Sequence, residues 1–257
     1  MIFNLGADGY QKDKKPPSFT TDAQYLYAEE VKSDGTYNWE LAILTSGSIT
    51  FHRVVPVDIF LVGGGAAGGI GYKPNPSDPN AYRGGSGGYG GGRVRRDAVT
   101  LSQNVPYAFV IGGSNGNTTG FGETAQSGAG SRGGGGGTAT NGYKDGAAAG
   151  MDGTVAFHNH ATETDLSLIT SLVGRKYGPG GGGGQVRSGN YYTIATAQGG
   201  ATGGGRGGND PTTTAGRPGV AGQANCGAGG GGGCTDNGAY YDGGAGGSGI
   251  IIIRNAR

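Results

Sequence analysis

The chain has 257 residues and a formal net charge of +1, and only 14% of its residues are charged. This balance excludes the basic surface that typifies nucleic-acid or anionic-membrane binding. Glycine supplies 63 residues and the hydrophobic fraction is 34%, so part of the chain must be ordered by backbone hydrogen bonds rather than by a conventional core.

Residues 1–37 are expected to form an N-terminal attachment segment with one candidate strand, QYLYAEEV. The first residues lack the charged-then-apolar order of a secretory signal, so we expect assembly in a cytoplasm. The longest purely apolar stretch, IIII at 250–253, is too short to span a bilayer. No membrane insertion is therefore expected.

Residues 38–257 are predicted to be a single all-β domain. Alternating apolar residues in NWELAILTSGSITFHR predict two strands around a Ser-Gly turn, and PVDIFLV reads as a buried strand. RRDAVTLS, YAFVIGG and the closing GIIIIRN are further strands. Because strands lie at both ends and glycine runs lie between them, we predict a jelly-roll-like β-sandwich with an inserted glycine-rich body at 63–93 and 128–249.

The stretch VDIFLVGGGAAGG matches G-x-G-x-x-G at Gly63, Gly65 and Gly68. A dinucleotide site would need a helix after the third glycine and an acidic residue about 20 positions further on. Prolines 74, 76 and 79 exclude that helix, and position 83 is an arginine. No cofactor is predicted, so these glycines need another explanation.

About seven glycine runs separate the strands, and two of them show a period of three. GGS-GGY-GGG places Ser86 and Tyr89 three apart, and GGA-GGS-G does the same for Ala245 and Ser248. Three residues per turn is the period of the polyproline II helix. Two glycines per triplet leave two faces bare, so such helices can pack as a hydrogen-bonded bundle. All-glycine runs suit its middle, and runs carrying Tyr89 or Arg206 suit its rim.

The strand endings DIFLVGGG and YAFVIGG, the TGFGE that follows, the GGGGG runs and the final GGAGGSGIIIIRN resemble the glycine-rich domain of phage and prophage tail-associated proteins. The resemblance covers about residues 38–257. In architecture the chain is also similar to the polyglycine bundles of T-even-type long-tail-fibre tips and to the glycine-rich ectodomain of anaplastic lymphoma kinase. It implies a non-enzymatic, virion-borne adhesin whose bundle loops contact a bacterial surface protein or glycan. It also implies tail proteins as partners, through the N-terminal segment or the sandwich.

The path of the chain selects the candidate loops. Since GIIIIRN belongs to the sandwich, working backwards places 234–242 and 185–198 at the far end and 209–226 near the sandwich; working forwards from PVDIFLV places 70–83 at the far end. The crossing through 138–177 stays open. The distal loops combine tyrosines with adaptable polar groups, as binding loops do. The candidate residues are Tyr72, Lys73, Tyr82, Arg83, Arg187, Asn190, Tyr191, Tyr192, Asp236, Asn237, Tyr240 and Tyr241.

Other chemistry is less well supported by the sequence. His158 and His160 could sit on one side of a strand as metal ligands, but two loop histidines are the favoured interpretation, and no metal is predicted. No catalytic constellation is recognised. The competing functions are a structural virion decoration or spacer and, less favoured, an ice-binding protein.

The spacing of Cys226 and Cys234 invites a disulfide, but a straight polyglycine helix between them would hold their Cα atoms about 25 Å apart. We therefore predict thiols at opposite ends of the bundle.

Overall fold

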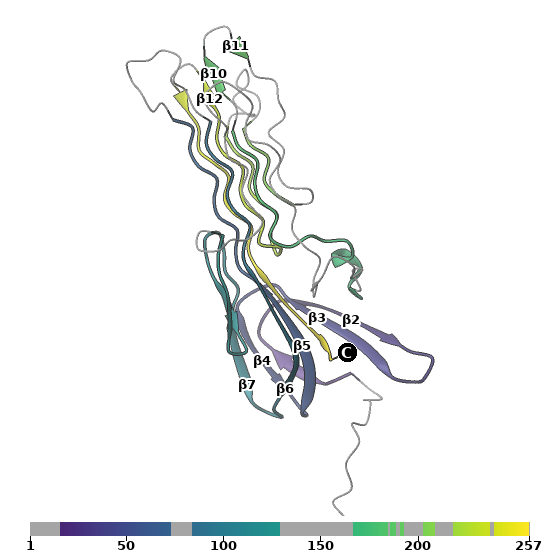
Figure 1. The fold of residues 1–257 in the computed structure, drawn as a ribbon. Coiled ribbons are helices and arrows are strands. Elements are labelled where there is room, and N and C mark those ends of the chain that lie inside the picture. The colour runs from purple at the N-terminus through teal and green to yellow at the C-terminus, as the bar shows by residue number, and fades with distance from the viewer. Residues whose placement is uncertain are drawn as a thin grey trace, which may run out of the picture.

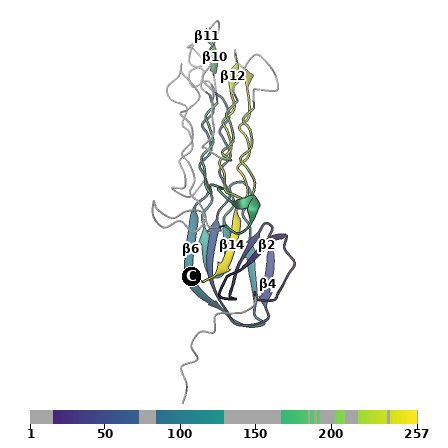
Figure 2. The same ribbon diagram turned by 90° about the vertical axis from the view of Figure 1, so that its right-hand side faces the viewer.

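The structure is a computed structural model, and it describes residues 16–72, 84–128, 167–184, 186–188, 191–192, 203–208, 218–236 and 239–256. Residues 186–188, 191–192 and 236 are described by their strand pairing alone. Figures 1 and 2 show a β-sandwich at one end and a long bundle of extended segments rising from it.

The sandwich consists of two antiparallel five-stranded sheets, which confirms the predicted all-β sandwich. The first sheet, in spatial order, contains β1 (Phe19–Thr21), β4 (Gly47–Phe51), β7 (Pro106–Val110), β8 (Thr118–Gly120) and β9 (Glu123–Ala125). The second sheet contains β2 (Tyr25–Val31), β3 (Tyr37–Ile43), β14 (Ile250–Asn255), β5 (Val55–Val62) and β6 (Arg93–Leu101). Both sheets therefore include a strand from the segment 1–37 that was expected to serve attachment.

The four isoleucines of β14 are buried because both faces of the second sheet are covered. Successive side chains of a strand point to opposite faces. Ile251 and Ile253 join Trp39, Leu41 and other residues in the core between the sheets. Ile250 and Ile252 face outwards, under residues 169–177 and the base of the bundle. That covering segment contains the one described helical turn, η1 (Thr170–Leu172).

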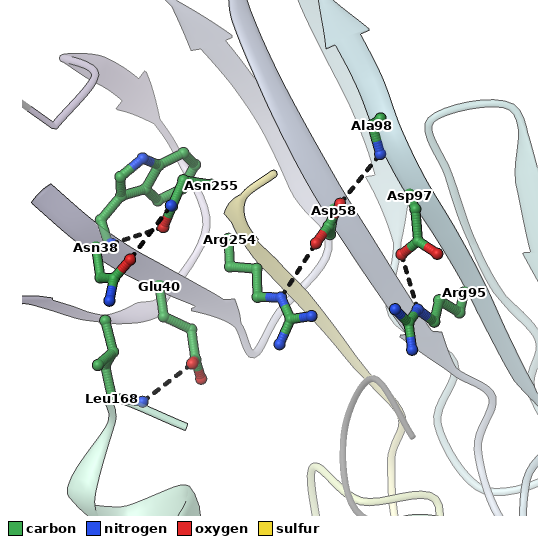
Figure 3. A network of polar contacts seen from close by, with 10 residues as sticks. Asn38, Glu40, Asp58, Arg95, Asp97, Ala98, Leu168, Arg254 and Asn255 are labelled. Carbon is green, nitrogen blue, oxygen red and sulfur yellow. Dashed lines mark hydrogen bonds and ion pairs between the residues drawn. The ribbon is translucent and has the colours of Figure 1, made fainter. Parts of the chain in front are cut away.

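A row of polar side chains crosses the outer face of the second sheet (Figure 3), and its members Glu40, Asp58 and Arg254 are buried. Arg254 lies in register with Glu40 on one side and Asp58 on the other, and its Nε donates to Asp58 Oδ2 at 3.3 Å. Glu40 accepts from Ser167 Oγ at 2.7 Å and from the amide of Leu168 at 3.1 Å. Glu40 thus anchors the start of the covering segment to the sheet.

The second sheet passes directly into the bundle. We call each straight, extended glycine-rich segment of the bundle a rod. The rod 63–71 continues β5, the rod 84–92 leads into β6, and the rod 241–249 leads into β14. Val62 pairs with Ile250, and three residues further along the amide of Gly65 donates to the carbonyl of Gly247. The same donation repeats from Gly68 to Gly244. Hydrogen bonds at every third residue are typical of packed polyglycine II helices. The strand pairing of the sheet therefore continues into the bundle as hydrogen bonds that repeat every three residues.

The segment 227–233 is the central rod of the bundle, because it exchanges backbone hydrogen bonds with every other described rod. These six neighbours are 63–71, 84–92, 178–184, 203–208, 218–223 and 241–249. Residues 227–233 are all buried, whereas Tyr89 and Arg206 are exposed. The predicted places of all-glycine runs and of side-chain-bearing runs are thus confirmed.

The predicted chain path is wrong in one region. Donations from Gly205 to Gly229 and from Gly208 to Gly232 show that 203–208 runs outwards, parallel to the central rod. We expected an inward run there. The inward run is 218–223 instead, since Val220 donates to Arg206 while Gln223 donates to Gly203. Part of the segment 209–226, expected near the sandwich as a connection, is therefore a rod.

Candidate functional site

A small third sheet lies at the far end of the bundle from the sandwich (Figures 1 and 2). Its order is β11-β10-β12-β13. The strands are β11 (Tyr191–Tyr192), β10 (Val186–Ser188), β12 (Thr235–Asp236) and β13 (Ala239–Tyr240). We call this end of the molecule the tip, comprising Tyr72, 186–188, 191–192, 234–236 and 239–241.

The tip sheet joins two loops that are distant in sequence. β10 and β12 pair in parallel, because the rods 178–184 and 227–233 that lead into them both run outwards, while each hairpin partner pairs antiparallel. The register places Arg187 opposite Tyr192 on one side and Asp236 on the other. Three of the predicted site residues thus share one cross-strand row.

The third loop is tied to the same sheet. The amide of Gly71 donates to the carbonyl of Tyr241 at 3.1 Å, and the amide of Tyr241 donates to the carbonyl of Cys234 at 3.2 Å. Tyr72 and Tyr240 remain 50% and 45% exposed, whereas Tyr241 is half-buried. The two exposed tyrosines present their rings at the end of a backbone held by hydrogen bonds.

The remaining predicted site residues fall outside the part of the chain that the structure describes. These are Lys73, Tyr82, Arg83, Asn190 and Asn237. The histidine pair His158 and His160 lies outside it as well. Among the residues that are described, no group of three or more His, Cys, Asp or Glu side chains is placed to hold a metal ion.

Sequence reasoning did not foresee the tip sheet itself. Its strands are only two or three residues long, which is too short for an alternation of apolar and polar residues to be recognised. The available signal was positional: two outward rods of matched length deliver Val186 and Thr235 to the same level.

The two cysteines mark the ends of the central rod. Cys226 lies in the apolar cluster on the outer face of the second sheet, and Cys234 directly precedes β12 at the tip. Both are buried thiols, so the predicted separation is confirmed. The Cys226 thiol donates to the carbonyl of Gln223 at 3.2 Å, and burial raises its pKa to about 11.

The glycines of the G-x-G-x-x-G match serve the bundle. The amides of Gly63, Gly65 and Gly68 donate to the carbonyls of neighbouring rods, and an added Cβ on any of them would meet backbone atoms closer than 3.0 Å. None of the helices in the described ranges is long and apolar enough to cross a membrane.

The chain belongs to the glycine-rich domain family, whose pattern it matches over residues 44–256. That range takes in most of the sandwich and the whole bundle. Among curated proteins, none matches the chain.

Proposed function

We propose that the protein is a phage tail-fibre or receptor-binding adhesin that recognises the bacterial cell surface through its tip. The observation that carries the proposal is the tip itself: three loops far apart in sequence meet at the outer end of a hydrogen-bonded bundle. The resemblance of the glycine runs and the closing GGAGGSGIIIIRN to phage tail-associated proteins supports the same assignment.

The physical case rests on preorganisation. Binding energy is lost when flexible loops must be ordered on contact. Here every third amide of the supporting rods already donates a backbone hydrogen bond. Tyr72 and Tyr240 are each adjacent to a residue of the last such bond, from Gly71 to Tyr241. Tyrosine provides a large amphipathic contact surface with little rotamer freedom, which makes it a common anchor in binding surfaces.

The opposite end of the molecule suits attachment. The sandwich contains the strands nearest the N-terminus and lies far from the tip (Figure 1). In this proposal it docks to other tail proteins within the virion, while a surface protein or glycan contacts the tip.

Two other functions make different predictions. Ice binding needs a flat face of regular small side chains, but outward positions of neighbouring rods carry Ile70, Tyr89 and Arg206, which differ in size and charge. A structural spacer would need no ligand contact at the tip at all.

Binding of the purified protein to host cells tests the proposal. Tyr240→Ala should weaken binding about tenfold or more, because hot-spot tyrosines cost about 2 kcal/mol when truncated. Tyr89→Ala is the matched control, since Tyr89 has a similar exposure of 47% but lies on the side of the bundle. Exchange of 185–198 or 234–242 for a Gly-Ser loop should weaken binding while the sandwich and the bundle stay folded. Unchanged binding after both exchanges would favour the spacer, and thermal hysteresis would favour ice binding.

A further inference from the structure

An aromatic groove opens at the side of the sandwich, away from the tip. It lies between the three-residue edge strand β1 of the first sheet and the seven-residue edge strand β2 of the second. The groove is open to solvent and has a volume of about 590 Å³. Its lining consists of residues 16–18, Phe19, Tyr25, Tyr27, Glu29 and Tyr37.

The sequence of β2 explains why these groups converge. Tyr25, Tyr27 and Glu29 alternate along the strand, so they project from the same face. At the centre of the sheet this face packs into the core, but β2 lies at the edge, where the Phe19 ring packs against it. The Phe19 ring meets Tyr25 edge-on, with centroids 5.4 Å apart, and meets Tyr27 at 6.0 Å with a tilt of 56°. The rings therefore form angled walls rather than a flat stack.

The polar group of the groove is negatively charged. Glu29 is exposed, and the Tyr27 hydroxyl donates to its Oε2 at 2.9 Å. No lysine, arginine or histidine lines the groove among the described residues. Among the described residues, four aromatic rings and one carboxylate line the groove without a cation, and these are the elements of a cation–π site.

We propose that this groove binds a small organic cation with an alkylammonium group. The cation would lie against the faces of Tyr25 and Tyr37, with Glu29 supplying the counter-charge. A saccharide is the alternative occupant, because its hydroxyls could donate to Glu29 and accept from the tyrosine hydroxyls. It is the weaker match because it carries no positive charge to meet the aromatic faces and the carboxylate together. The site is independent of receptor recognition at the tip.

Calorimetric titration of the full chain with choline tests this proposal, with 3,3-dimethylbutan-1-ol as the uncharged isostere. We expect millimolar-range binding of choline and at least tenfold weaker binding of the alcohol. Tyr25→Ala and Glu29→Gln should each weaken choline binding about fivefold or more. Tyr89→Ala, on the bundle, should leave it unchanged.

Tyr27→Phe keeps the ring and removes the hydroxyl, so it should retain choline binding within about threefold and serve as a conservative variant that folds. Equal binding of choline and the alcohol would reduce the groove to an apolar surface and overturn the proposal. Binding of glucose, galactose or N-acetylglucosamine in place of choline would overturn it too, as would the absence of heat at 50 mM choline.

Discussion

At Gly231 the methyl group of an alanine would overlap the carbonyl oxygen of Arg206, and the other glycines of the central rod meet backbone carbonyls in the same way. Neither the central rod nor the rod that carries the carbonyl can move away, because each is held by hydrogen bonds to its other neighbours. Glycine is therefore required here by the distance between backbones, whereas its entropic cost of about 0.5–1 kcal/mol per residue works against folding.

Gly231→Ala should destabilise the protein by at least about 3 kcal/mol, the range of severe overpacking. Gly113→Ala is the matched control, because its added Cβ has nothing within 4 Å. We expect that change to lie within about 0.5 kcal/mol of the parent. Urea denaturation measures both. A mild effect at Gly231 would mean that the rods can separate locally.

Cys226 makes stability depend on alkaline pH. Burial raises the pKa of its thiol from 9.0 to about 11, so the unfolded chain loses this proton first. Stability from this group is complete below pH 9 and is lost as pH rises towards 11, by at most about 2–3 kcal/mol. The urea midpoint of the parent should fall more steeply over this window than that of Cys226→Ala. The same dependence of the urea midpoint on pH in both proteins would show that Cys226 is not the titrating group.

Among the elements, the longer strands were predictable from sequence because alternation or continuous burial marks them. PVDIFLV and GIIIIRN became β5 and β14. The rods 84–92 and 241–249 were recognisable because two glycines fill each triplet. The rod 218–223 was not, because it lies at the rim and needs glycine only where it touches the bundle. Gly219 and Gly222 meet that need, while Val220 is 53% exposed.

The candidate site shows the same limit. The clustering of distal loops followed from counting outward and inward rods. The error at 203–208 does not displace these loops, because 178–184 and 227–233 both run outwards and lead directly into β10 and β12. The pairing of Arg187 with Asp236 could not be predicted, since register between short strands depends on where two separate rods end.

The edge strand β6 contains a bulge held by a buried carboxylate. The register shifts opposite Asp58, whose Oδ1 accepts from the amide of Ala98 at 3.0 Å, and Ala98 adopts φ +52°. A left-handed conformation costs a non-glycine residue about 1–2 kcal/mol. Ala98→Gly should therefore stabilise the protein by up to about 1 kcal/mol in thermal denaturation. Ala108→Gly, an exposed position in the regular strand β7, should destabilise it by about 0.5–1 kcal/mol. Equal effects of the two changes would contradict this account.

For the molecule as a whole, the sandwich and the bundle share backbone and hydrogen bonds across β5, β6 and β14. The base of the central rod also packs, through Ala228, into the outer apolar cluster of the second sheet. We expect one cooperative unfolding transition rather than two. Fluorescence of Trp39, the single tryptophan, reports on the sandwich, and hydrogen exchange of amides 227–233 reports on the bundle. The two should give the same free energy of unfolding. Lower protection in the rod would show that the bundle opens separately.

The hydrogen-bond repeat of three constrains how such a protein can change over evolutionary time. Deleting one residue from 227–233 would rotate everything beyond the cut by a third of a turn and bring every later amide against the wrong neighbour. A tolerated change of rod length must therefore come in triplets and must occur in all adjoining rods together. The tip has no such constraint, because a loop can lengthen by any number of residues after its rod has ended. Lineages of this fold should accordingly keep the height of the bundle almost constant while the sequences at its summit diverge freely.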